Sequence, residues 1–193
     1  MISRFLQQLE HHWVISTGPA GLILLMVTPA LAELIPAWLV WVWIQLPIYM
    51  LHQCEEHLGD RFRVWVNNKL GGGKELLTRR DVVVINLPGV WGVIAASFLL
   101  AVLADPGFGL IAIYLTLVNA VVHLIAAVRF FAPNPGIWTV IALFTPASVG
   151  GLIAFNDAET GTLLMHAIGL GVALFIHLAI VARVVFAFRR STR

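Results

Sequence analysis

Charged side chains are scarce in this sequence. Of its 193 residues only 11% are Asp, Glu, Lys or Arg, whereas 60% are hydrophobic. An average soluble domain carries roughly 25% charged residues, so this composition excludes a soluble enzyme and a disordered chain. Cysteine occurs once, as Cys54, which excludes an internal disulfide scaffold. The formal net charge of +2 does not indicate a nucleic-acid-binding protein. A polytopic membrane protein is the class that remains.

Long apolar runs are abundant. A membrane helix needs roughly 20 mostly apolar residues at about 1.5 Å each, and no segment alternates with the period of two that a membrane barrel requires. The sequence therefore predicts an all-α bundle of about six transmembrane helices, at residues 13–32, 35–56, 82–104, 108–131, 136–155 and 162–187. Residues 1–34 form an N-terminal amphipathic and first membrane segment, 35–187 the main transmembrane domain, and 188–193 a basic tail. The first apolar segment can also be read as a cleaved secretory signal.

Basic residues predict the orientation of these helices. Six of the twelve Lys and Arg fall between the second and third spans, and the others, Arg183 among them, lie toward the same face of the bundle. The three loops of the opposite face contain acidic residues and no Lys or Arg. Because Lys and Arg are retained on the cytoplasmic side, we expect both termini in the cytoplasm and the protein in the inner membrane of a prokaryotic cell.

Ionisable side chains inside a span are costly in a bilayer and are functional candidates by default. The densest group closes the second span, where His52, Glu55 and Glu56 stand at i, i+3 and i+4 on one helix face. Counting residues along the spans places His123 and His177 at the depth of His52, in the cytoplasmic half of the membrane. Each of these residues alone has a structural explanation, such as a helix end at the headgroups or an interhelical hydrogen bond. Their common depth favours a shared site.

A metal centre is the chemistry that fits this set. Imidazole and carboxylate ligands suit Zn²⁺ or iron, and zinc is preferred because a di-iron site needs more carboxylates than the chain supplies. The predicted ligands are His52, Glu55, His123 and His177. Glu56 is then free to act as a general base. The side-chain amides of Asn86 and Asn119, which enter near the same level, can polarise a substrate carbonyl.

Three short blocks carry a resemblance to a known family. They are HQCEE at residues 52–56, NAVVH at 119–123 and NPGIWT at 134–139. In this order the chain resembles the bacterial and archaeal HXXEE-domain membrane proteins over roughly residues 35–185, with His177 as the candidate for their histidine in the last span. Family members tend to carry an aromatic residue where this chain has His57, which leaves open whether His57 joins the site. The family is a domain of unknown function, so the resemblance implies an intramembrane polar site and names no reaction.

The leading functional hypothesis is a membrane-embedded, metal-dependent hydrolase. A lipid or another membrane-partitioned ester or amide would reach a site at this depth, and the metal would activate water. An iron oxidoreductase is the alternative enzyme activity. Two other classes stay open: a proton- or cation-coupled transporter that uses Glu55, Glu56 and His123, and an assembly protein whose polar residues only lock helices together. The oligomeric state is not predicted.

Overall fold

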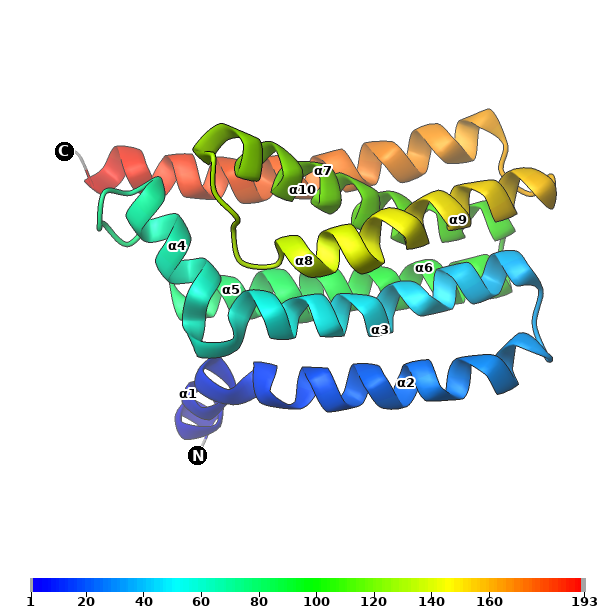
Figure 1. Cartoon of the computed structure of the whole chain (residues 1–193), viewed down its shortest axis with the longest axis horizontal. Helices are drawn as coiled ribbons and strands as arrows, with labels where there is room; N and C mark the ends of the chain where they lie inside the picture. Colours follow the sequence, from blue (N-terminus) through cyan, green and yellow to red (C-terminus); the bar gives the residue numbers. More distant parts are fainter. Residues whose placement is uncertain (1, 192–193) are drawn as a thin grey trace.

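The computed structural model describes residues 2–191, and over that range it is helical with no strand. The helices lie side by side along one long axis (Figure 1). Five helical stretches are long and apolar enough to cross a membrane, namely Gln7–Ala32, Arg79–Leu103, Pro106–Phe130, Ile137–Asp157 and Leu163–Arg190. A sixth, α3 (Ala37–His57), has 21 residues and lies among them, and its polar last turns lower its hydropathy. The predicted all-α polytopic bundle is confirmed, and the orientation of its termini stays a prediction.

The second helix packs closely on α3. α1 (Ile2–His12) leads through η1 (Trp13–Ser16) into α2 (Thr17–Ala32), which lies along α3. A Cβ atom on Gly21 would stand 2.8 Å from the carbonyl oxygen of Pro47. Small residues permit this approach, which is how membrane helices gain packing contacts.

A sharp reversal follows α3 at the end of the bundle. Gly59 and Asp60 both have positive φ, 71° and 64°, so the chain turns back at once into α4 (Arg61–Lys69). Asp60 Oδ2 lies 2.6 Å from Arg63 Nη2 and 2.9 Å from Arg79 Nη2. The hydrogen bond with Asp60 raises the pKa of the Arg63 guanidinium above its ordinary value. These contacts hold α4 across the end of α3 (Figure 1).

Two of the long helices contain a π-helical turn. α5 (Arg79–Val84) continues through η3 (Ile85–Trp91) into α6 (Gly92–Leu103), and α8 (Ile137–Thr139) continues through η5 (Val140–Phe144) into α9 (Thr145–Asp157). π-helical turns are rare and occur frequently at functional sites. Both turns lie close to the polar end of α3, where Asn86 and Thr139 meet its side chains.

α7 (Leu110–Phe130) follows the short η4 (Pro106–Gly109) and packs against α3, α6 and α9 around a core that includes Ile113, Phe144 and Phe155. The last helix, α10 (Leu163–Ser191), packs along α7. Only 6% of the most apolar stretch of α10 is buried, whereas the same fraction is 22–39% in the other four helical stretches that are long and apolar enough to cross a membrane. α10 is therefore the least enclosed wall of the bundle.

Candidate metal centre and its pocket

Three buried side chains converge where α3 meets α7. His52 is fully buried, and Glu56 and His123 are 6% and 4% exposed. Glu56 Oε2 lies 3.4 Å from His52 Nε2, and Glu56 Oε1 lies 3.4 Å from His123 Nε2. One ligand atom from each of the three residues lies within 4.8 Å of the others. The cluster of His52, Glu56 and His123 can therefore hold a metal ion.

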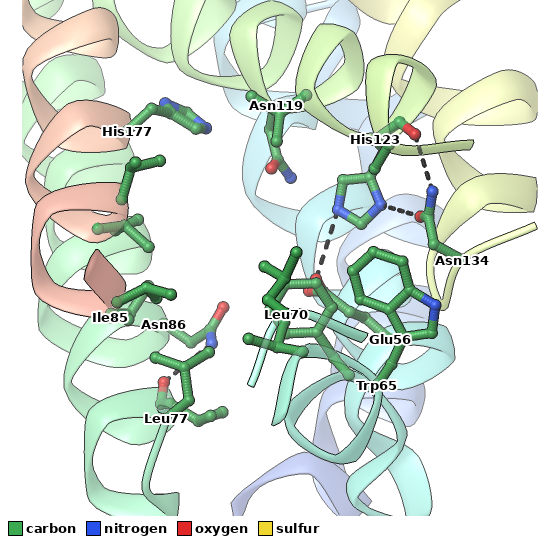
Figure 2. A pocket seen from close by; sticks show the side chains of 18 of the residues that line it. Glu56, Trp65, Leu70, Leu77, Ile85, Asn86, Asn119, His123, Asn134 and His177 are labelled. Carbon is green, nitrogen blue, oxygen red and sulfur yellow. Dashed lines mark hydrogen bonds and ion pairs between the residues drawn. The ribbon is translucent and has the colours of Figure 1, made fainter. Parts of the chain in front are cut away.

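The nitrogen that His123 presents to Glu56 is fixed by Asn134. Asn134 Nδ2 donates to the backbone oxygen of His123 at 2.8 Å, which leaves Asn134 Oδ1 facing His123 Nδ1 at 2.6 Å. An amide oxygen only accepts, so Nδ1 carries the proton and donates. The lone pair of His123 Nε2 is then directed at Glu56. Figure 2 shows these contacts at the wall of a pocket.

Thr139 orients His52 in the same way. Thr139 Oγ1 lies 2.6 Å from Glu55 Oε2 and 3.0 Å from the backbone oxygen of Gly136. Both of those oxygens only accept, so they use the single hydroxyl proton. Thr139 Oγ1 therefore accepts from His52 Nδ1, 2.9 Å away. As a result, His52 Nε2 also presents a lone pair to Glu56.

A chain of side-chain amides orients the neighbouring His57. Trp91 Nε1–H can only donate, and it donates to Gln53 Oε1 at 2.6 Å. Gln53 Nε2 then donates to Asn86 Oδ1 at 2.8 Å. Asn86 Nδ2 is left to donate to the Val82 carbonyl at 2.9 Å and to His57 Nε2 at 3.0 Å. His57 Nε2 is thus an acceptor as well, and it lies 3.0 Å from Glu56 Oε2.

These hydrogen bonds leave His52 Nε2 and His123 Nε2 facing the Glu56 carboxylate with lone pairs, and Asn119 Nδ2 is a donor that reaches His52 Nε2 at 3.4 Å. Imidazole lone pairs directed at a carboxylate repel it unless a cation is shared among them. The distances between the ligand atoms distinguish a shared proton from a shared metal ion. A charge-assisted N–H···O bond spans about 2.7–2.9 Å, whereas two ligands at about 2.0–2.1 Å from one tetrahedral ion lie about 3.4 Å apart. The contacts of Glu56 with His52 and His123 are both 3.4 Å, which fits two edges of a metal site, whereas its 3.0 Å contact with His57 Nε2 has the length of a hydrogen bond.

Glu55, predicted as a metal ligand, lies outside this cluster. Its oxygens accept from the backbone N–H of Trp138 at 3.2 Å, the backbone N–H of Thr139 at 2.7 Å and the Thr139 hydroxyl at 2.6 Å. The first N–H groups of a helix have no intrahelical partner and attract a carboxylate, and here they draw Glu55 to α8. The structure places Glu56, predicted as the free base, in the ligand group. Glu56, rather than Glu55, therefore lies in the cluster that could hold a metal, and Glu55 is bound at the start of α8.

Of the other predicted residues, Asn86, Asn119 and His177 line the pocket, and Arg183 lies on α10 outside its lining. His177 lies across the pocket from His123, outside the three-residue cluster, with Nδ1 at 2.8 Å from the Ala173 carbonyl (Figure 2). Asn119 projects between those histidines, and its Nδ2 lies 3.4 Å from His52 Nε2. Asn86 reaches the cluster only through His57. Arg183 pairs with Asp81 at 3.0 Å. Of the four predicted ligands, the structure thus brings together His52 and His123.

The NPGIWT block supplies residues that the sequence prediction did not assign. Asn134 and Thr139 orient the two imidazoles, and Gly136 makes room for them. Gly136 has φ 95°, and a Cβ atom there would stand 2.5 Å from His52 Cε1 and 3.1 Å from His123 Cε1. A glycine is therefore required for both conformation and space. The block itself was the available signal, because its polar and glycine residues interrupt an otherwise apolar stretch.

A pocket of about 480 Å³ opens beside the cluster. Its lining is mostly apolar and comes from the end of α3, α4, the loop before α5, α5 with η3, α7 and α10. Glu56, His57, Asn119, His123 and His177 are among its polar lining residues. Figure 2 shows α7 and α10 on two sides of this space. The volume lies within the range of about 300–1,000 Å³ that is usual for small-molecule sites.

Comparison with known proteins agrees with these motifs. The family model described as a protein of unknown function with an HXXEE motif matches residues 43–150, more than half of the chain. The chain therefore belongs to the HXXEE family, and the predicted resemblance is confirmed. No curated protein and no solved structure matches it. The matched range contains the whole metal-ligand cluster and the NPGIWT block, whereas α10 lies beyond it.

Proposed function

We propose that this protein is a membrane-embedded, metal-dependent hydrolase that acts on a membrane-partitioned ester or amide. The observation that carries the proposal is the convergence of two imidazole lone pairs and one carboxylate at an apolar pocket. Two histidines and one glutamate are a ligand set of catalytic zinc sites, which keep a fourth position open for water. Zinc is preferred over iron because only Glu56 contributes a carboxylate to the cluster.

A bound Zn²⁺ would activate a water molecule and polarise a carbonyl group. The protein supplies the orientation. Asn134 and Thr139 hold His123 and His52 with their Nε2 atoms toward the site. Such outer partners are usually worth 10- to 100-fold in metal affinity or activity.

Two further pocket residues are suited to the reaction. Asn119 stands beside the cluster and can donate its amide N–H to a substrate carbonyl oxygen. With Glu56 occupied as a ligand, His57 is the nearest imidazole left to take a proton from the attacking water, because its Nε2 lies 3.0 Å from the Glu56 carboxylate. The general-base role would thus pass from Glu56 to His57, whose Nε2 must first give up the hydrogen bond from Asn86 Nδ2.

Hydrolysis is tested with zinc-loaded protein in proteoliposomes that contain a long-chain nitrophenyl ester or a long-chain nitroanilide. We expect product release that stops with a chelator, returns with zinc, and falls at least 100-fold in Glu56→Gln and in His123→Ala. Glu55→Gln is the matched control, since it makes the same chemical change one residue away and keeps the ligand cluster. Zinc-loaded protein that releases product from neither probe would contradict the proposal. Cation flux through the same vesicles, lost in Glu56→Gln, would assign a transporter instead.

A further inference from the structure

We infer that the pocket binds a single-chain lipid ester with an anionic phosphate headgroup, which enters from the membrane between α5 and α10 and places its headgroup at Arg183. The inference deepens the proposed function, because the same pocket would deliver the substrate to the metal cluster. Binding itself needs neither a metal nor turnover, so the two proposals can fail separately.

The pocket reaches the outer surface of the bundle along α10. Val181 and Val185 both line the pocket, yet they are 53% and 43% exposed. Val82 and Ile85 of the α5–η3 stretch also line the pocket, and Figure 2 shows Ile85 on the same side of the space as His177 of α10. Since these exposed valines belong to a membrane-spanning helix, the opening faces lipid. A membrane-partitioned ligand can therefore enter sideways, without crossing the polar surface.

The volume has room for an acyl chain. A space of about 480 Å³ lies within the range of about 300–1,000 Å³ that is usual for small-molecule sites, and its lining is mostly apolar. We therefore take a single-chain, lysophospholipid-like molecule as the ligand, and a two-chain phospholipid serves as the comparison that tests this choice.

Selectivity must come from polar contacts at the entrance. A lipid tail that moves from the bilayer into the pocket exchanges one apolar environment for another and gains little free energy. Arg183 lies on α10 between the lining residues Val181 and Val184, and its side chain is 42% exposed. Guanidinium groups bind phosphate through paired hydrogen bonds. Arg183 is six residues beyond His177, so a headgroup there lies about 9 Å along the helix from the histidine that faces the cluster.

The present partner of Arg183 can release it at little cost. Arg183 Nη2 lies 3.0 Å from Asp81 Oδ2. The same oxygen accepts from the Thr78 backbone N–H at 2.9 Å and from the Thr78 hydroxyl at 2.8 Å, as part of the α5 capping box. Asp81 therefore keeps two hydrogen bonds when Arg183 turns to a ligand. The ion pair joins α10 to α5 beside the lining residues Val82 and Val184, and it can open without leaving an unpaired carboxylate.

Trp65 lines the pocket and serves as the reporter of occupancy. The probe is lysophosphatidylglycerol with a doxyl spin label on its chain, titrated into detergent-solubilised protein. We expect saturable quenching of tryptophan fluorescence, with the saturable part lost in Trp65→Phe. Arg183→Gln should raise the half-saturating concentration about five- to tenfold, because one half-exposed charged hydrogen bond is lost. Arg183→Lys should recover part of that loss.

Arg190→Gln is the matched control, since it removes the same charge from the same helix, where the guanidinium lies over the Phe186 ring at 4.6 Å. It should bind the probe as the wild type does. Unchanged binding in Arg183→Gln, or equal binding of a zwitterionic lysolipid or of two-chain phosphatidylglycerol, would overturn the inference. Loss of quenching in Arg190→Gln as well as in Arg183→Gln would also overturn it, because general charge would then explain the effect. Retained probe binding in a protein without turnover would leave this inference standing and contradict the hydrolase.

Discussion

Replacing Gly136 by alanine tests how the two imidazoles are held. The new Cβ would stand 2.5 Å from His52 Cε1, whereas carbon atoms in contact lie about 3.5–4.0 Å apart. The His52 ring must then move by on the order of 1 Å. The substitution also forces an L-residue to φ 95°, which costs about 1–2 kcal/mol. Gly73→Ala is the matched control: φ there is 91°, and a Cβ would meet nothing within 4 Å.

The magnitude follows from the difference between these two variants. Both carry the backbone cost, so the difference in their unfolding free energies reports the clash alone, about 1–3 kcal/mol for an overpacked site. Zinc affinity should fall about 100-fold in Gly136→Ala, since a displacement of about 1 Å at a site can cost that factor. We expect wild-type affinity in Gly73→Ala.

Competition against a chromophoric chelator in detergent measures zinc affinity, and thermal unfolding of the same samples measures stability. Equal zinc affinity in Gly136→Ala and Gly73→Ala would refute the placement of His52 against Gly136. A fall of similar size in both variants would show that backbone strain, rather than contact with the imidazole, governs the site.

Three other substitutions separate the residues around the cluster. Asn134→Ala should weaken zinc binding about 10- to 100-fold in the same titration, because His123 Nδ1–H loses its acceptor; unchanged affinity would contradict the assigned orientation of the ring. Glu55→Gln should keep zinc but lower the free energy of unfolding, measured by urea titration, by about 1–3 kcal/mol, since charged hydrogen bonds at the start of α8 are weakened. Loss of zinc with an unchanged free energy of unfolding would instead make Glu55 the ligand. His177→Ala should retain the wild-type zinc content by mass spectrometry, as His177 lies outside the cluster, and loss of zinc would restore it to the ligand set.

Composition and spacing were sufficient to predict the bundle. Apolar runs of membrane-spanning length do not depend on tertiary contacts, so the all-α architecture and its six helices follow from counting residues. The expected second span, 35–56, differs from α3 (Ala37–His57) by two residues at one end and one at the other. The common depth of His52 and His123 also followed from counting, because helical rise is constant.

The choice between the two glutamates could not be predicted. His52 reaches Glu55 at i+3 and Glu56 at i+4 equally well on an isolated helix. The outcome depends on the start of α8, whose free N–H groups lie 83 and 84 positions further along the chain and bind Glu55. His177 was placed by depth alone, and depth does not give the direction a side chain takes around its helix. The residues that orient the imidazoles were missed because they act through hydrogen bonds between distant segments.

The metal content of the purified protein tests the central claim most directly. After equilibration with Zn²⁺ and removal of unbound metal, inductively coupled plasma mass spectrometry gives zinc per chain for the wild type, Glu56→Gln and Glu55→Gln. We predict one zinc per chain in the wild type and in Glu55→Gln, and less than about a tenth of that in Glu56→Gln, because the cluster loses its only carboxylate ligand. A wild type without stoichiometric zinc, or full zinc content in Glu56→Gln, would contradict a metal centre formed by His52, Glu56 and His123.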